Sequence, residues 1–173
     1  RLCQDGGLVP IVEPEVLMDG DHDIDRCDEV TTETLHVVFG ALHRQGVSLE
    51  NMLLKPNMVI AGKDCSRQAD VEEVAKRTVW CLRRTVPAAV PGIVFLSGGQ
   101  SEQVATAHLN AMNAKFGPHP WTLSFSYGRA LQDGALKSWR GSSDNTAAAQ
   151  NALATRAKLN SAAVKGEYTG EAA

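Results

Sequence analysis

One lysine in this sequence stands where its amine could do covalent chemistry. Lys55 directly follows the apolar run Met52–Leu54, which is typical of a parallel strand covered on both faces. Pro56 lacks an N–H and restricts the residue before it, so the strand is expected to end at Lys55. Burial there would lower the pKa of the amine, and a neutral amine can form a Schiff base with a carbonyl substrate. The alternative is an ordinary lysine that reaches from the strand end into water.

Two carboxylates follow an earlier apolar run. Leu8–Val12 predicts a short strand that leads into Glu13 and Glu15, and residues two apart on a strand share one face. Such a pair could serve as acid and base if its surroundings set the two pKa values apart. The alternative is a solvated strand end, which is the usual place for glutamate.

A glycine-rich turn joins a third predicted strand, Gly92–Leu96, to a helix that begins near Ser101. Ser97 and Gly98 lie in this turn. Glycines there allow close backbone approach to a ligand, and the free N–H groups of the helix suit a phosphate. Glycine also occurs in ordinary tight strand-to-helix turns that bind no ligand. From this turn alone, a phosphate site and an ordinary turn both remain open.

A second turn of the same kind follows the fourth predicted strand, Trp121–Ser126. It carries Gly128 and Arg129, and the planar guanidinium of arginine matches phosphate geometry. The alternative for Arg129 is a surface salt bridge.

The elements that must position these residues alternate along the chain. Helices are predicted over about residues 25–45, from 70 to before Pro87, 101–113, 130–139 and 146–165. Buried stripes are expected at Leu35, Val38, Phe39 and Leu42, at Val71, Val74, Thr78 and Leu82, and at Ala105, Leu109 and Met112.

Four strand–helix repeats predict an α/β fold with a parallel sheet, and the candidate residues all follow strand C-termini. A TIM (β/α)8 barrel has its site there, as does an open doubly wound sheet. Eight units need about 250 residues. We therefore expect the C-terminal half of a barrel, strands 5–8 plus a C-terminal helix, over residues 1–166, and a flexible tail over 167–173.

Composition narrows the classes of partner. Hydrophobic residues make up 43% of the 173 residues, enough for a packed core, and the net charge is −3 with both signs interspersed. No charged block indicates nucleic acid or an anionic membrane as partner, and no apolar run approaches 18 residues. The first residue is Arg1, as expected for a piece of a longer protein.

We expect no metal. The four cysteines form no CxxC pair and have no histidine at finger-like spacing; they are Cys3, Cys27, Cys65 and Cys81. The acidic loop Asp19–Asp23 superficially resembles a calcium loop, but Val30 stands where an EF-hand has its twelfth-position glutamate. We interpret the cysteines as reduced thiols.

The chain resembles the C-terminal half of class I fructose-bisphosphate aldolases. Four segments carry the resemblance, in the family's order and at about its spacing: Val9–Glu15, Leu53–Val59, Phe95–Glu102 and Phe125–Leu131. The similarity extends from near Leu2 to near Tyr168. The family's first four strands are absent, and Tyr168 does not match the functional tyrosine that ends the family's chains.

This resemblance implies reversible cleavage of fructose 1,6-bisphosphate to dihydroxyacetone phosphate and glyceraldehyde 3-phosphate, without a cofactor. Lys55 matches the Schiff-base lysine, Glu13 the acid/base glutamate and Glu15 a second carboxylate. The residues matching the phosphate-binding turns are Ser97, Gly98, Gly128 and Arg129. The resemblance also implies a homotetramer that includes the N-terminal half of the barrel, and a cytoplasmic location, with an organelle still open.

Two other functions remain open from the sequence. One is a non-catalytic phosphosugar-binding or scaffold fragment. The other is a different imine-forming barrel enzyme, such as a transaldolase-like one, although two phosphate turns fit its singly phosphorylated substrates less well.

Overall fold

Four parallel strands form one sheet in the order in which they occur along the chain. The computed structural model describes residues 1–171. The strands are β1 (Ile11–Val12), β2 (Leu53–Leu54), β3 (Gly92–Phe95) and β4 (Thr122–Phe125), in the order β1-β2-β3-β4. This topology confirms the predicted α/β class. The first strand is shorter than predicted, because its backbone hydrogen bonds to β2 begin at Pro10 O. Leu8 and Val9, which come before it, are 66% and 65% exposed.

Helices connect the strands at the predicted places. They are α1 (Leu2–Asp5), α2 (Ile24–Arg44), α3 (Val71–Thr85), α4 (Glu102–Lys115), α5 (Arg129–Trp139) and α6 (Thr146–Val164), with 3-10 turns η1 (Leu49–Asn51) and η2 (Ser143–Asn145). Three of these helices begin at side chains that accept a hydrogen bond from a backbone N–H three residues later: Asp23, Asp70 and Ser101. Among the described residues, α1 and the two 3-10 turns were not predicted, because elements of three or four residues show no periodicity.

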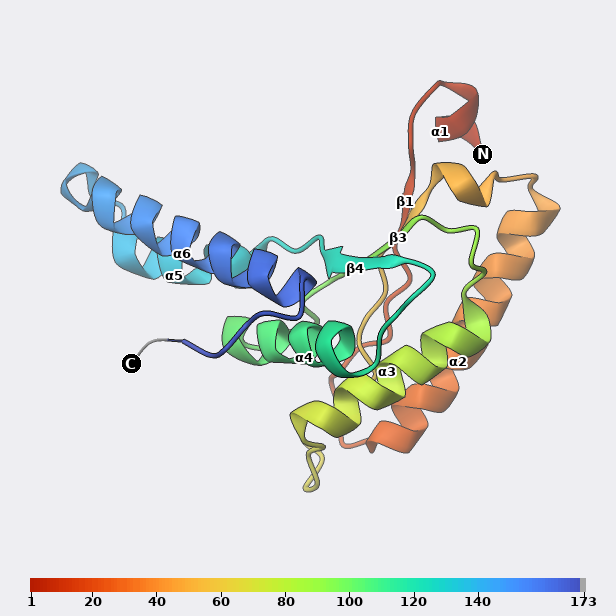
Figure 1. Ribbon diagram of the computed structural model, residues 1–173, viewed down its shortest axis with the longest axis horizontal. Coiled ribbons are helices and arrows are strands. Elements are labelled where there is room, and N and C mark those ends of the chain that lie inside the picture. The colour runs from red at the N-terminus through yellow and green to blue at the C-terminus, as the bar shows by residue number, and fades with distance from the viewer. Residues whose placement is uncertain (172–173) are drawn as a thin grey trace.

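The long helices lie side by side over one face of the sheet. In Figure 1, α2, α3 and α4 follow one another across the sheet, and α6 packs on α4 and α5. The register places Val12, Leu54, Ile93 and Leu123 on the same face of the sheet. The last three of these side chains are at most 2% exposed and form the core with the inner faces of the helices.

The helix stripes are mostly as predicted. Leu35, Val74 and Leu82 are at most 3% exposed, and Phe39 and Leu42 pack partly buried against the core. Val71 is the exception: it was predicted to face inward but is 38% exposed. As the first residue of α3, it precedes the point where the helix meets the sheet.

Within the described part of the chain, no helix layer covers the opposite face of the sheet. It carries Ile11, Leu53, Gly92 and Thr122, which the register aligns across the four strands. Ile11 is 50% exposed and Leu53 is partly exposed, whereas Met52 and Leu54 are fully buried. The prediction that β2 is covered on both faces is therefore wrong for Leu53 in this chain. In a closed barrel, side chains from other strands fill this face.

The chain after α6 makes specific contacts. The backbone N–H of Tyr168 donates to Asn110 Oδ1 at 2.9 Å, and the Tyr168 ring packs partly buried against the core. The predicted flexible tail, 167–173, thus includes contacts at its start, while Ala172 and Ala173 lie outside the described residues.

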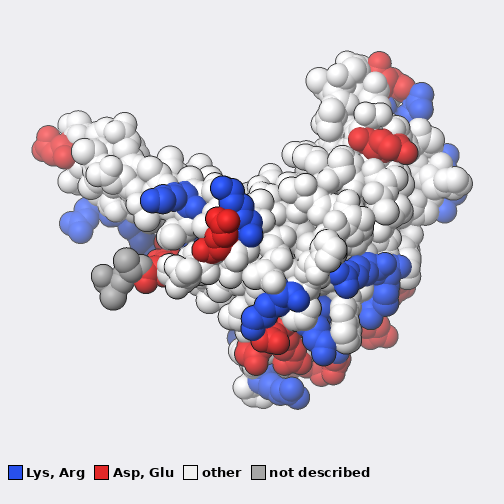
Figure 2. Space-filling model, viewed as in Figure 1, with Lys and Arg blue, Asp and Glu red and all other residues white. Residues whose placement is uncertain are grey.

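Charged side chains of both signs are intermingled on the surface. Figure 2 shows this over the region of α2 and α3. Arg77 of α3 pairs with Asp25 and Asp28 of α2, and Lys115 of α4 pairs with Glu72 of α3. Within residues 1–171, no helix is both long and apolar enough to span a membrane.

Candidate active site

Lys55 and Glu13 meet at the C-terminal ends of the two neighbouring strands β2 and β1. The backbone N–H of Lys55 donates to Val12 O at 2.8 Å, which continues the β1–β2 ladder past the last strand residue. Because side chains alternate along a strand, Lys55 lies on the same open face as Leu53. Its Nζ is 3.1 Å from Glu13 Oε1, and the side chains are 20% and 48% exposed. The structure thus places a largely buried amine beside a carboxylate.

Glu15 lies further along the same segment and is exposed. It forms no ion pair within residues 1–171, so the structure brings Glu13 but not Glu15 into contact with Lys55. The next residue is fixed, because Val16 N–H donates to the side chain of Asn57 at 3.0 Å.

Asn57 lies within the segment Leu53–Val59 and was not among the predicted site residues. It is 6% exposed, and its amide also donates to Thr31 Oγ1 and Met58 O, both at 3.1 Å. It therefore holds the loop after β1 against the loop after β2 and α2. The only feature of the sequence that could have indicated this role is the position of Asn57 directly after Lys55-Pro56.

The Ser97–Gly98 turn follows β3, next to Lys55. Leu96 N–H donates to Pro56 O at 3.2 Å, which holds the two strand ends side by side. Gly98 and Gly99 have φ of 57° and 82°, the left-handed region that favours glycine. Ser97 is 6% exposed. The glycines are therefore required by the backbone of the turn itself.

A histidine that the sequence did not single out braces this turn. The backbone and side-chain N–H groups of Gln100 both donate to Ser97 O, at 3.0 and 3.3 Å. The Gln100 amide oxygen accepts from His108 Nδ1 at 2.7 Å. Burial lowers the pKa of His108 to about 4, so the ring is neutral in the folded protein at ordinary pH.

Arg129 begins α5 at the end of β4. Ser126 N–H donates to Phe95 O at 3.0 Å, so this strand end lies beside β3. Gly128 has an ordinary φ of −96°, and no atom lies within 4 Å of where its Cβ would be. Arg129 is exposed and forms no ion pair among the described residues, so the surface salt bridge is not formed there.

A hollow of about 490 Å³ opens between the first turns of α4 and α5. Ser97, Gly99, Arg129 and Lys137 contribute to its lining, and Lys137 pairs with Asp133 at 2.6 Å. Neighbouring parallel strands are about 5 Å apart, so Lys55, Ser97 and Arg129 follow three adjacent strand ends within about 10 Å. The amine of Lys55 thus follows the strand next to one of these turns and two strands from the other, and the turns present N–H groups and a cation, a combination suited to a carbonyl compound bearing phosphate.

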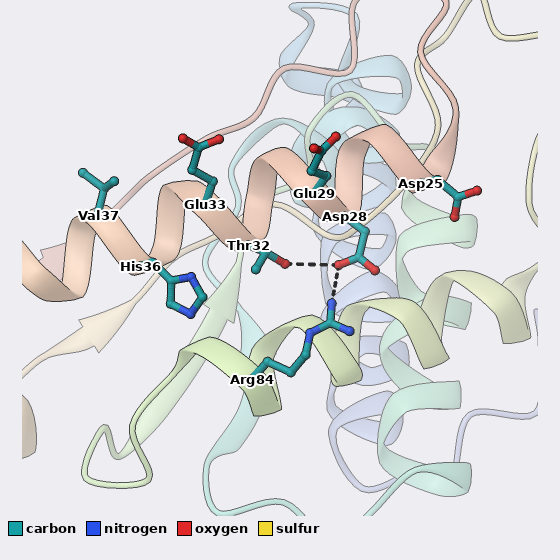
Figure 3. A pocket seen from close by; sticks show the side chains of 8 residues that line it. All are labelled: Asp25, Asp28, Glu29, Thr32, Glu33, His36, Val37 and Arg84. Carbon is teal, nitrogen blue, oxygen red and sulfur yellow. Dashed lines mark hydrogen bonds and ion pairs between the residues drawn. The ribbon is translucent and has the colours of Figure 1, made fainter.

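A second hollow of about 490 Å³ is lined only by α2 and α3 side chains (Figure 3). Three of its polar side chains bond to one another: Arg84 Nη2 donates to Asp28 Oδ1 at 2.7 Å, and Thr32 donates to the same oxygen at 3.3 Å. It belongs to the helix layer, on the other side of the sheet from Lys55.

No group of three potential metal ligands comes together within residues 1–171. In the acidic loop, Asp23 caps α2, and Asp19 pairs with Lys63 at 3.2 Å. All four cysteines are free thiols, and burial raises the pKa of Cys81 to about 11.

Fold and site together define half of a (β/α) barrel with a lysine at the end of a central strand. The chain belongs to the class I fructose-bisphosphate aldolase family, whose family model matches residues 1–173.

Individual relatives agree with this assignment. The chain is 58% identical over 170 residues to a probable fructose-bisphosphate aldolase class 1 of Xanthomonas campestris, covering 98% of this chain and 51% of the relative. It is 58% identical to fructose-bisphosphate aldolase B of Gallus gallus, covering 96% and 46%, and 55% identical to the cytosolic aldolase 4 of Arabidopsis thaliana, covering 99% and 44%.

A solved structure shows the same fold. The aldolase of Plasmodium falciparum, in complex with TRAP and a small-molecule inhibitor, superposes with a TM-score of 0.96 at 54% identity, covering 98% of this chain and 49% of that one. The chain therefore spans about half the length of the relatives it matches, and the predicted half-barrel is confirmed.

Proposed function

We propose that residues 1–173 carry the lysine-bearing half of the active site of a class I fructose-bisphosphate aldolase. The reaction is the reversible cleavage of fructose 1,6-bisphosphate to dihydroxyacetone phosphate and glyceraldehyde 3-phosphate. The observation that carries the proposal is the 3.1 Å contact between Lys55 Nζ and Glu13 Oε1 at adjacent strand ends. Family membership supports it.

In this proposal Lys55 is the nucleophile. Its amine attacks the C2 carbonyl of the ketose, and loss of water leaves a protonated imine. When the C3–C4 bond breaks, its electron pair moves into the imine to give an enamine, and the C4 hydroxyl proton passes to a base. Glyceraldehyde 3-phosphate then leaves. Protonation of the enamine at C3 and hydrolysis of the imine release dihydroxyacetone phosphate and restore the amine.

Glu13 is the proposed proton carrier, because its carboxylate already contacts the amine that becomes the imine. We assign Glu15 a supporting role as a second carboxylate, two residues further along the chain. The imine takes the electron pair itself, so the proposed reaction uses neither a metal nor a cofactor.

The two strand-to-helix turns are the proposed substrate-phosphate sites. Ser97 and Gly98 present the turn before α4, and Gly128 and Arg129 the turn before α5. Arg129 supplies a cation with no ion-pair partner of its own in residues 1–171. Holding a phosphorylated sugar in register over Lys55 is catalysis by proximity.

We propose that the complete protein also contains the N-terminal half of the barrel and assembles as a homotetramer. The open face and the two edge strands, β1 and β4, support the presence of the N-terminal half, because a closed barrel has no edge strands. Relatives described as cytosolic or cytoplasmic support a cytoplasmic location.

The test is reductive trapping in the full-length protein. Borohydride with dihydroxyacetone phosphate should add the mass of the reduced adduct to the peptide that contains Lys55. Label on another lysine, with none on Lys55, would overturn the proposal. Binding of the sugar phosphate without any trapped adduct would instead support a non-catalytic binding protein.

A further inference from the structure

A buried arginine lies behind the two phosphate turns. Arg156 of α6 is 5% exposed. Its Nη2 is 3.1 Å from Glu102 Oε1 on α4 and 2.5 Å from Glu171 Oε1 in the segment after α6. Its Nη1 donates to Thr106 Oγ1 at 3.2 Å. A cation this deeply buried is costly unless its partners are fixed around it.

Further polar groups lie at the same place. Thr106 donates to Asn160 Oδ1 at 2.8 Å, which links α4 to α6 a second time. The Tyr127 hydroxyl is also buried there: burial raises the pKa of this phenol, and the neighbouring Asn160 and Thr106 oppose the shift. The Tyr127 ring is held edge-on against Phe125, with centroids 4.2 Å apart.

The polar cluster around Arg156 includes residues next to both phosphate turns. Glu102 is the first residue of α4, the helix that follows the Ser97–Gly98 turn. Tyr127 is the residue directly before Gly128 and Arg129. Arg156 therefore contacts the helix that begins at one turn and lies beside the residue that precedes the other. Neither contact involves the open face, where Lys55 lies.

We propose that Arg156 is a positioning residue that holds the two phosphate turns in the relative placement needed to bind the phosphorylated substrate. This inference rests on the proposed aldolase function. Without the guanidinium, the Glu102 carboxylate, whose side chain is only 17% exposed, would lose its ion-pair partner, and the first turn of α4 would have to move to hydrate it. The turn that presents Ser97 would move with it. Lys55 would keep its place on β2.

The experiment separates phosphate recognition from imine chemistry. In the full-length protein, borohydride trapping at Lys55 is titrated with dihydroxyacetone phosphate and with dihydroxyacetone, which lacks the phosphate. The variants are Arg156→Met and Arg156→Lys. The control is Arg26→Met, which removes an exposed ion pair to Glu29 on α2.

We expect Arg156→Met to raise the half-saturating concentration of dihydroxyacetone phosphate about tenfold or more while leaving that of dihydroxyacetone unchanged. Arg156→Lys should recover part of the loss, because lysine keeps the positive charge but lacks the planar guanidinium that bonds to several partners at once. Arg26→Met should match the wild type. If Arg156→Met does not fold, Arg156→Lys and Glu102→Gln are judged by the same selective loss.

Two results would overturn the inference alone: wild-type affinity for dihydroxyacetone phosphate in the folded variants, or an equal loss for both ketoses, as a merely structural role would give. Failure of the wild-type protein to trap either ketose would be a different result. It would overturn the proposed function, and this inference with it.

Discussion

The amine of Lys55 and the carboxylate of Glu13 contact each other across two neighbouring strands, 3.1 Å apart, at the edge of the sheet where both strands end. They are far apart in the sequence, so only the parallel pairing of β1 with β2 brings them together. The contact puts the proposed proton carrier within hydrogen-bond distance of the atom that, in the proposed reaction, bonds to substrate.

Glu13→Gln should slow imine formation and turnover roughly 100- to 10,000-fold, the range typical of lost general acid–base catalysis. The amide keeps the size of the side chain but cannot carry the proton. Single-turnover trapping at Lys55 measures the effect. Glu33→Gln, an exposed carboxylate on α2, is the matched control and should behave as the wild type. A Glu13→Gln rate within a few-fold of wild type would remove Glu13 from the chemistry.

Lys55→Arg should be inactive, because arginine stays charged at neutral pH and cannot act as a nucleophile. The guanidinium still offers a cation to Glu13, so the fold is expected to persist. Activity and the thermal unfolding midpoint are measured together. Turnover in this variant would show that another residue carries the covalent step.

Arg129→Ala and Ser97→Ala should each weaken binding of the bisphosphate by about 1.5–3 kcal/mol, the cost of one charge-assisted contact. This corresponds to roughly a tenfold to hundredfold loss of affinity. Trapping of unphosphorylated dihydroxyacetone at Lys55 should be unaffected. Arg67→Ala, in an exposed loop, is the control. Unchanged affinity in Arg129→Ala would place this side chain outside the site.

Stability should fall in mild acid because of His108. Burial holds its pKa near 4, below the unfolded value of about 6.5, so the unfolded chain takes up the proton first. The stability that this difference supplies is complete above about pH 6.5 and is lost as pH falls toward 4, by about 3 kcal/mol at most. Urea unfolding of the full-length protein at pH 7.5 and 5 measures it. His108→Gln should show a smaller loss; equal losses in both proteins would contradict the prediction.

Residues 1–173 expressed alone should be inactive and prone to self-association. Strands β1 and β4 leave two open edges, and the uncovered sheet face exposes apolar side chains such as Ile11, which is 50% exposed. Light scattering and an aldol-cleavage assay on the purified piece test this. A well-behaved monomer with full activity would show that the half-barrel is sufficient by itself.

Much of the local structure was determined by the sequence alone. The strand at Leu53–Leu54 was predictable because an apolar run stops at Lys55-Pro56, and proline cannot continue a ladder. The start of α3 was predictable because Asp70 can cap it. These signals are local: each depends on residues within a few positions of one another. The order of the elements then restricted the topology to a parallel sheet.

The tertiary structure alone decided which side chains meet. Lys55 pairs with Glu13 and not with Glu15, although the sequence predicts that both glutamates share one face of the same strand. Arg156 reaches Glu102 from 54 residues away, and no periodicity in the sequence predicts that pairing. The sequence does not distinguish Leu53 from Leu54, yet Leu53 is partly exposed and Leu54 is buried. Such differences depend on strand pairing and on which face a helix layer covers, which are non-local properties of the fold.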